Sequence, residues 1–385
     1  MLQTKQNLRR DTLRKLQSTN KSSELIALRL AYSEDSKLLT GCINKLVNVN
    51  RVYPTHLPTQ ASFRWSTFNP PITNWPRKCI NPFCQDNLKL HLTVDSSQED
   101  IDRFFTPAEY IEHEWTDKCW SVRDILSPDS DEIMISWDHD NIEGKIHDLI
   151  VNDTEAIQAH ESGYDLHTIT TCNIFGYDYP TDLRNPHSST VDTSWRSRYN
   201  WQGKDTKQRV LAKNFNHGSK YTKTWRFVYK IQGIEKYGVA RERLGQLAKV
   251  YISSKQEAWQ HKLNIMEDIC KKRVAHTLYG GRRIFFDSSE ETAREGFSHM
   301  ISGTVSDYNN HTLILIEEWL GDSVRLLHNA HDGNKIAVKM SAIVEWGNVN
   351  NSMSIFKDKL KAIIERPIEY QGRSLTMTAG VKIYG

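Results

Sequence analysis

Two aspartates, each beside a predicted turn, are the residues of this sequence best suited to bind a metal. Asp138 directly follows the apolar segment 132–137, which is predicted to be a buried strand. Asp332 lies at the tip of a hairpin predicted between strands 323–328 and 335–339. Carboxylates on adjacent strands can hold two divalent cations for phosphoryl transfer, and Mg²⁺ prefers such oxygen ligands. Aspartates are also common in ordinary turns, so this pair alone does not establish a metal site.

A second set of polar residues recurs every four positions along a helix that is predicted to begin near Thr206 and to run past Lys220. This spacing places all of them in one stripe on the helix; they are Arg209, Lys213, His217 and Tyr221. Arginine and lysine one turn apart can bind a triphosphate, and an aromatic ring further along can stack on a base. A solvated basic helix is the alternative.

A third segment combines polar side chains with prolines. Residues 61–67 surround Arg64, and residues 69–76 contain three prolines together with Thr73 and Asn74. An extended polar strip of this kind could follow a nucleic-acid groove, although a surface loop has the same composition.

In this order, these segments resemble the polymerase domain of family A DNA polymerases, the DNA polymerase I type. The resemblance extends from about residue 22 to residue 340 and depends on seven short motifs. They are Ala61–Thr67 with Asn69–Pro76, Asp138–Glu143, Tyr164–Thr168 with Ile174–Gly176, Arg209–Tyr221, Leu278–Arg283, Ser302–Thr304 with Asp307, and His331–Asp332.

The resemblance implies a role for each matching residue. Asp138 and Asp332 would bind two Mg²⁺ ions, for which Mn²⁺ could substitute, and Lys213 would also donate a proton to pyrophosphate. The incoming dNTP would contact Arg209, Lys213, His217, Tyr221, Glu143 and His167. Glu143 would block a ribose 2′-OH. The primer-template DNA would contact Arg64, Thr73, Asn74, His331, Arg282, Arg283 and Ser302.

Four positions depart from the family pattern. His217 stands where the family has Phe or Tyr, which puts discrimination at the 3′ position of the sugar in doubt. Thr222 replaces a glycine and Ser302 replaces a glutamine. Gly333 replaces the acidic residue that follows the His331–Asp332 motif in the family, so this motif supplies no third carboxylate. None of these changes removes an implied metal ligand.

The resemblance implies an α+β chain with the right-hand polymerase fold, in which an antiparallel palm sheet combines with helical fingers and a reduced helical thumb. We expect the thumb at 1–50, the palm at 51–140 and 281–385, and the fingers at 141–280. Helices are predicted at 5–18, 22–47, 107–114, 141–160, 237–276 and 288–320. Segments 79–125 and 178–206 are interpreted as insertions, the latter a loop. The first insertion contains Cys79, Cys84, His113 and Cys119, whose loose spacing favours isolated thiols over a zinc site.

Composition agrees with a folded polyanion-binding protein. The 385 residues carry a net charge of +3 and include 38% hydrophobic residues. No apolar run approaches the roughly 18 residues that a membrane span needs. Six cysteines are too few for a disulfide scaffold. Acidic residues concentrate in 91–165, between two basic regions. The basic N-terminus permits a mitochondrial leader, but we expect the cytoplasm of a bacterial cell or a virus-infected host.

We therefore expect template-directed 5′→3′ DNA synthesis from dNTPs, in a chain without proofreading or 5′-nuclease domains, as in a virus or mobile element. A separate processivity or exonuclease protein is the expected partner. Two alternatives remain open: a single-subunit RNA polymerase or primase, and a non-catalytic protein that binds primer-template. Glu143 argues against the first, and the retained aspartates and cations argue against the second.

Overall fold

The computed structural model describes residues 128–184, 193–203, 206–230, 239–344 and 352–384. It also describes two short antiparallel strands, β1 (Thr55–Leu57) and β2 (Ser66–Phe68), which belong to a compact unit other than that of residues 128–385. Several predictions lie outside the described residues: helices 5–18, 22–47 and 107–114, insertion 79–125 with its cysteines, and the proposed DNA contacts Arg64, Thr73 and Asn74.

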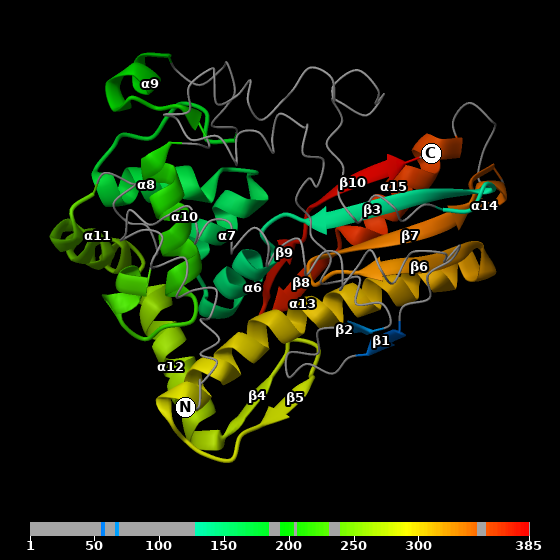
Figure 1. Cartoon of the computed structure of the whole chain (residues 1–385). Helices are drawn as coiled ribbons and strands as arrows, with labels where there is room; N and C mark the ends of the chain where they lie inside the picture. The colour runs from blue at the N-terminus through cyan, green and yellow to red at the C-terminus, as the bar shows by residue number, and fades with distance from the viewer. Residues whose placement is uncertain are drawn as a thin grey trace, which may run out of the picture. The chain divides into compact units, whose positions relative to one another are not determined.

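A four-stranded antiparallel sheet is the centre of the larger unit (Figure 1). Its strands, in spatial order, are β10 (Ala379–Tyr384), β3 (Glu132–His139), β7 (Gly333–Lys339) and β6 (Val324–Asn329). The strand predicted at 132–137 and the hairpin after residue 323 are both confirmed. The sequence analysis did not predict β10, although it pairs along most of β3.

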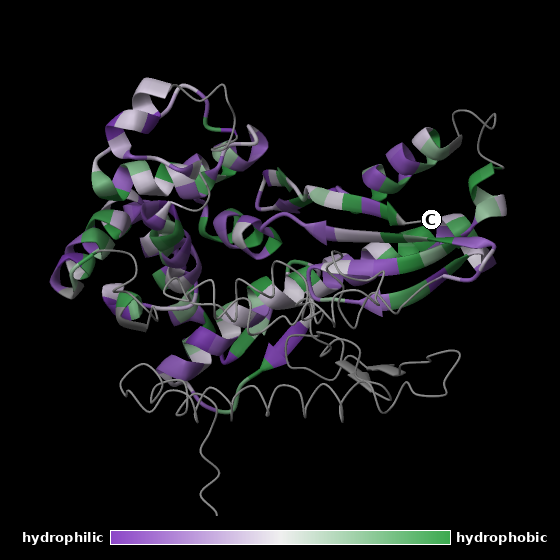
Figure 2. Cartoon of the chain, turned by 45° about the horizontal axis from the view of Figure 1, so that its top comes forward, coloured by the Kyte–Doolittle hydropathy of each residue, from purple (hydrophilic) through white to green (hydrophobic). Residues whose placement is uncertain are grey.

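One face of this sheet is covered by helices. Alternate residues of β3 point to that face, and Ile133, Ile135 and Trp137 pack with Phe356 and Ile316. These two partners come from α15 (Ser352–Ile364) and α13 (Glu290–Leu320). Green hydrophobic segments mark the strands and parts of α13 in Figure 2. Because strand side chains alternate, Asp138 faces away from this core, and it is exposed.

The remaining helices form the second part of the unit, joined to the sheet by the long helix α13 (Figure 1). They are α6 (Ile142–Val151), α7 (Thr154–Glu161), α8 (Leu166–Phe175), α9 (Thr193–Tyr199), α10 (Lys207–Ser219), η5 (Trp225–Lys230), α11 (Arg241–Ser254) and α12 (Gln256–Lys272). The smaller elements are β4 (Val274–His276), β5 (Arg282–Ile284), η7 (Gly321–Ser323), α14 (Met340–Val344), β8 (Pro367–Tyr370) and β9 (Arg373–Thr376).

Two apolar clusters hold these helices together. One joins α6 and α12 to the first half of α13 through residues such as Ile146, Met266 and Phe297. The other packs α8, η5 and α11 around α10 and includes Phe215 and Tyr251. The helix that carries the predicted cationic stripe is therefore fixed from several sides.

Three of the predicted elements differ in the structure. The helix predicted at 237–276 is interrupted at Lys255, which has a non-helical backbone conformation and separates α11 from α12, and its last residues form the strand β4. The helix predicted at 141–160 is two helices, because Asn152 adopts a left-handed conformation with φ 58° and Asp153 starts α7 by accepting a hydrogen bond from the Ala156 N–H. The predicted loop 178–206 contains α9, which packs through the buried Trp195. None of the described helices has the length and hydrophobicity that crossing a membrane requires.

Candidate active site

The two aspartates predicted to bind metal lie at one end of the neighbouring strands β3 and β7. Asp138 pairs with Gly333 in the register, and the His139 N–H donates to the carbonyl oxygen of Asp332 at 2.8 Å. Gly333 allows this approach, since a Cβ there would lie 3.0 Å from Asp138 Cα and closer still to the Trp137 carbonyl oxygen. Gly333, which stands where the family has an acidic residue, therefore lies at a position with no room for a side chain.

These carboxylates suit Mg²⁺ by their chemistry and their access to solvent. Asp138 is exposed and Asp332 is half-buried. Within the described part of the chain, no three His, Cys, Asp or Glu side chains form a metal-binding group. A cation bound here would therefore complete its shell with water or substrate oxygens, as Mg²⁺ commonly does.

Glu143 connects four segments of the site. Its carboxylate accepts hydrogen bonds from Ser302 Oγ at 3.0 Å and from Tyr221 Oη at 3.3 Å, and His331 Nε2 lies 3.0 Å from Oε1. These segments are the first turn of α6, which holds Glu143, the residues after α10, which include Tyr221, the helix α13, which holds Ser302, and the β6–β7 turn, which holds His331. The structure therefore brings together residues that the sequence analysis assigned separately to dNTP and DNA binding.

The β6–β7 turn is held by two asparagines that the sequence analysis missed. Asn309 Nδ2 of α13 donates to the carbonyl oxygen of His331 at 2.6 Å, and Asn334 Nδ2 donates to Asn309 Oδ1 at 3.3 Å. These contacts fix the turn that carries Asp332. No local pattern in the sequence could have revealed them, because the first one joins residues 22 positions apart.

The cationic stripe of α10 divides into an exposed part and a buried part. Lys213 and His217 are exposed, and Tyr221 is half-buried. Arg209 is buried and binds the carboxylate of Asp165 with two hydrogen bonds, of 2.7 Å from Nε and 2.6 Å from Nη2. The four residues therefore do not share one environment, because Arg209 faces the interior while Lys213 and His217 face solvent.

Asp165 is a further residue that the sequence analysis did not assign. It caps α8 by accepting from the Thr168 N–H at 3.1 Å, and it orients Arg209. Burial acts to raise the pKa of Asp165, but the hydrogen bonds and charge of Arg209 outweigh it and lower the pKa. A cap signal was present, since aspartate is a preferred residue directly before the first turn of a helix.

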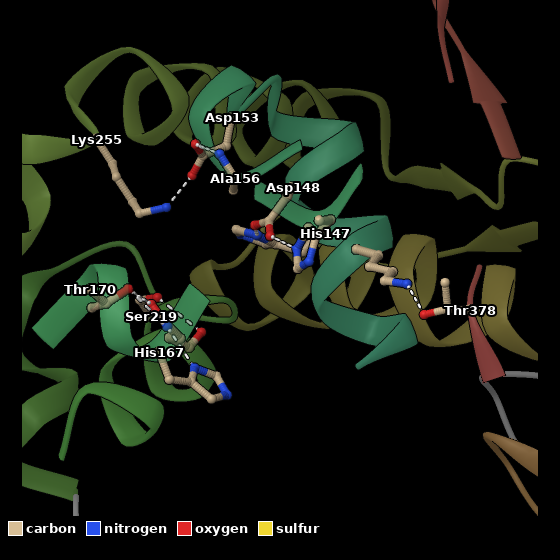
Figure 3. Close-up of polar contacts among 12 residues, drawn as sticks. His147, Asp148, Asp153, Ala156, His167, Thr170, Ser219, Lys255 and Thr378 are labelled. Atoms are coloured by element: carbon tan, nitrogen blue, oxygen red, sulfur yellow. Dashed lines mark hydrogen bonds and ion pairs between the residues drawn. The ribbon is translucent and has the colours of Figure 1, made fainter. Parts of the chain in front are cut away.

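The imidazole of His167 lies near Arg209 and Lys213, and that of His217 lies near Lys213. The rings of His167 and His217 have their centroids 5.9 Å apart, and Asn216 Nδ2 donates to His167 Nδ1 at 2.9 Å. Figure 3 shows His167 with Thr170, which also bonds Asn216. Burial lowers the pKa of His167 to about 3, and the nearby Arg209 and Lys213 act in the same direction. The side chain of His217 reaches solvent, but partial desolvation of its ring, together with the nearby Lys220 and Lys213, lowers its pKa to about 4. Both imidazoles are therefore neutral at pH 7.

A network of buried charges lies behind these residues. Asp153 forms an ion pair with Lys255, and Asp148 accepts from His147 at 2.8 Å (Figure 3). Lys145 of α6 donates to Thr378 Oγ1 at 2.6 Å, which ties the helix after Asp138 to the start of β10. These contacts tie α6 and α7 to the elements around them.

Two of the three predicted DNA-binding arginines lie in β5, apart from the Glu143 contacts. Arg282 is exposed, whereas Arg283 forms an ion pair with Glu295 of α13 and lies over the ring of Phe285. Of the predicted DNA-binding residues that the structure describes, only Ser302 and His331 join the site around Glu143.

Comparison with known proteins gives consistent results. The family model described as DNA polymerase family A matches residues 2–365. DNA polymerase I of Streptococcus pneumoniae, in two strains, is 24% identical over 242 residues, which cover 58% of this chain and 24% of each relative. The chain thus spans about a quarter of the length of these curated relatives.

A solved structure extends the likeness to the fold. The POL domain of Pol1 from M. smegmatis, in complex with DNA primer-template and dNTP, matches 97% of this chain and 55% of that chain. The TM-score is 0.63 and the sequence identity is 15%. The predicted α+β polymerase fold is therefore confirmed.

Proposed function

Because this chain belongs to DNA polymerase family A, we propose that it extends a DNA primer in the 5′→3′ direction, copying a template from dNTPs. The observation that carries the proposal is the convergence on Glu143 of Tyr221, Ser302 and His331, directly beside the Asp138 and Asp332 strand ends. The primer-template and dNTP in the M. smegmatis structure support the same ligands here.

In the proposed reaction the primer 3′-oxygen bonds to the α-phosphorus of the dNTP, and the bond from that phosphorus to pyrophosphate breaks. Asp138 and Asp332 would hold two Mg²⁺ ions, or Mn²⁺ in their place, which when bound neutralise charge on the reacting phosphate. The exposed Lys213 would bind the triphosphate and give a proton from Nζ to the leaving pyrophosphate. Arg209, oriented by Asp165, would bind the same group.

The neutral imidazoles of His167 and His217 would donate hydrogen bonds to the nucleotide without adding charge. Glu143, fixed by its three donors, would occupy the space next to the sugar 2′ position. Tyr221 would lie near the templating base. For DNA we propose Arg282, Arg283, Ser302 and His331, together with Arg64, Thr73 and Asn74.

The domain division is also a proposal. The sheet residues support a palm at 51–140 and 281–385, the helices α6 to α12 support fingers at 141–280, and residues 1–50 would be the thumb. We further propose a cytoplasmic setting, and a partner protein for processivity or exonuclease activity.

A primer-extension assay tests the function. Asp138→Ala and Asp332→Ala should each reduce extension by at least about a thousandfold, because charge stabilisation at the phosphate is worth several kcal/mol. Primer-template affinity should change little, since it depends mainly on phosphate contacts. Asp322→Ala is the matched control, because this exposed carboxylate lies at the far end of β6.

The same assay with NTPs separates the alternatives. Strong extension by either metal-site variant would refute the polymerase proposal. Extension from NTPs as fast as from dNTPs would favour the RNA polymerase or primase alternative. No extension by the wild type with any nucleotide would favour the non-catalytic primer-template-binding alternative.

A further inference from the structure

A buried lysine in α12 contacts the end of the helix that carries the cationic stripe. Lys262 is only 2% exposed, and its Nζ donates to the carbonyl oxygens of Ser219 at 2.8 Å and Thr222 at 2.9 Å. The same Nζ lies 3.2 Å from the ring centroid of Trp259. Both charge states of a lysine amine have at least two N–H groups, so either can serve both carbonyls.

The Ser219 carbonyl belongs to the last residue of α10, where backbone acceptors lack partners within the helix, and the Thr222 carbonyl lies in the segment that follows the helix. Helices often solve this problem with a glycine in the left-handed conformation just after the last turn. Here Lys220 continues in the right-handed helical region and Thr222 follows Tyr221. The Lys262 side chain of α12 therefore supplies a hydrogen bond to the last carbonyl of α10, which a glycine-based helix end would supply through its own backbone N–H groups.

Tyr221 lies between the two carbonyls that Lys262 holds. Its hydroxyl donates to Glu143 Oε2 at 3.3 Å, and this hydrogen bond joins the segment after α10 to α6. We propose that Lys262 is a positioning residue, which fixes Tyr221 against Glu143 and thereby contributes to sugar selection. The proposal rests on the proposed function only for its last step, the effect on the nucleotide.

Another buried lysine nearby provides a matched control. Lys255, seven residues earlier, forms an ion pair with Asp153 and is 12% exposed, but no contact joins it to Ser219 or Thr222 among those that the structure describes. Removing it breaks a buried ion pair and should destabilise the protein at least as much. It therefore separates general loss of stability from a specific loss at Tyr221.

Hydrogen exchange tests the positioning step without any need for activity. In Lys262→Met, backbone amides of residues 219–224 should exchange about tenfold faster than in the wild type, because the end of α10 opens more often. Lys255→Met should leave this segment at the wild-type rate relative to the rest of α10. Equal exchange at 219–224 in both variants would overturn the proposal. If Lys262→Met does not fold, Lys262→Gln takes its place, since its shorter side chain cannot reach both carbonyls.

A double-mutant cycle tests the effect on the nucleotide. Lys262→Met should raise the rNTP-to-dNTP ratio of kcat/KM by about threefold to tenfold, the range that the loss of one hydrogen bond covers. Tyr221→Phe should do the same, and the double variant should show no further rise. Multiplying effects in the double variant, or an equal rise in Lys255→Met, would show that Lys262 does not act through Tyr221. A wild type that extends no primer would overturn the proposed function, while the exchange comparison would still decide the position of Tyr221.

Discussion

Substituting Glu143 is the sharpest test of the proposal that this residue selects the sugar of the nucleotide. Hydrogen bonds from Tyr221, Ser302 and His331 fix the position of the carboxylate. The Glu143 side chain is 30% exposed, so one side of it faces solvent. If the Glu143 side chain fills the space that a 2′-OH would need, Glu143→Ala should raise the rNTP-to-dNTP ratio of kcat/KM at least tenfold. Tenfold corresponds to about 1.4 kcal/mol of lost discrimination.

The stability cost of this substitution should be moderate. Each hydrogen bond to Glu143 contributes about 0.5–1.5 kcal/mol, but water can replace part of it at a partly exposed site. We therefore expect Glu143→Ala to lower the free energy of unfolding by about 1–2 kcal/mol in total. Urea denaturation of the variant and the wild type measures this, and it shows that the altered ratio comes from a folded enzyme.

Glu143→Gln is the control for side-chain volume. Its amide oxygen can still accept from Ser302 and His331, while its amide N–H groups can donate to the Tyr221 hydroxyl. Since glutamine keeps almost the same side-chain volume, the rNTP-to-dNTP ratio of kcat/KM should stay within about threefold of the wild type. Steady-state kinetics of all three proteins with dNTP and rNTP on one primer-template measures the comparison.

Two results would refute this reasoning. An unchanged ratio in Glu143→Ala would mean that the carboxylate only stabilises the start of α6 by its charge, which contributes about 0.3–1 kcal/mol. An equal rise in the alanine and glutamine variants would mean that charge, rather than volume, excludes the ribose.

Two further predictions concern lysines in and behind the site. Lys213→Ala should reduce single-turnover extension far more than primer-template affinity, because this exposed side chain is proposed to bind the triphosphate; a defect in DNA affinity alone would contradict that role. Burial lowers the pKa of Lys262 from 10.5 to about 6, so between pH 6 and 10 the unfolded chain binds a proton that the folded protein does not. Stability should therefore rise with pH across this window, by up to about 1.4 kcal/mol per pH unit. Urea denaturation at pH 7 and pH 9 should show a smaller rise in Lys262→Met than in the wild type, and identical rises would mean that Lys262 keeps its proton.

Local sequence patterns predicted the elements whose hydrophobic residues or turn residues form a clear pattern. The run from Glu132 to Trp137 has too few polar residues for an exposed segment, and it forms the central part of β3. The residues around Gly333 form the expected hairpin. In contrast, β10 was missed because a short C-terminal strand has little periodic signal of its own and is defined by its pairing with β3.

The contacts that define the site could not be predicted in the same way. Glu143 meets partners 78, 159 and 188 residues away in the chain. The family resemblance indicated that these residues belong to one site, but not which hydrogen bonds they make. Lys262 was not singled out at all, because a lysine in a helix with many charged residues has no sequence feature that shows it is buried.

Arg209 illustrates why residue spacing alone does not determine where a side chain points. A four-residue repeat places Arg209 and Lys213 in one stripe, yet the first is buried and the second is exposed. The difference comes from Asp165, whose carboxylate offers the flat guanidinium two parallel hydrogen bonds on the inner side of α10. A buried guanidinium without such a partner would be strongly unfavourable. The ion pair therefore fixes the orientation of Arg209 before any nucleotide binds, and a triphosphate at this position would meet an arginine that is already in place.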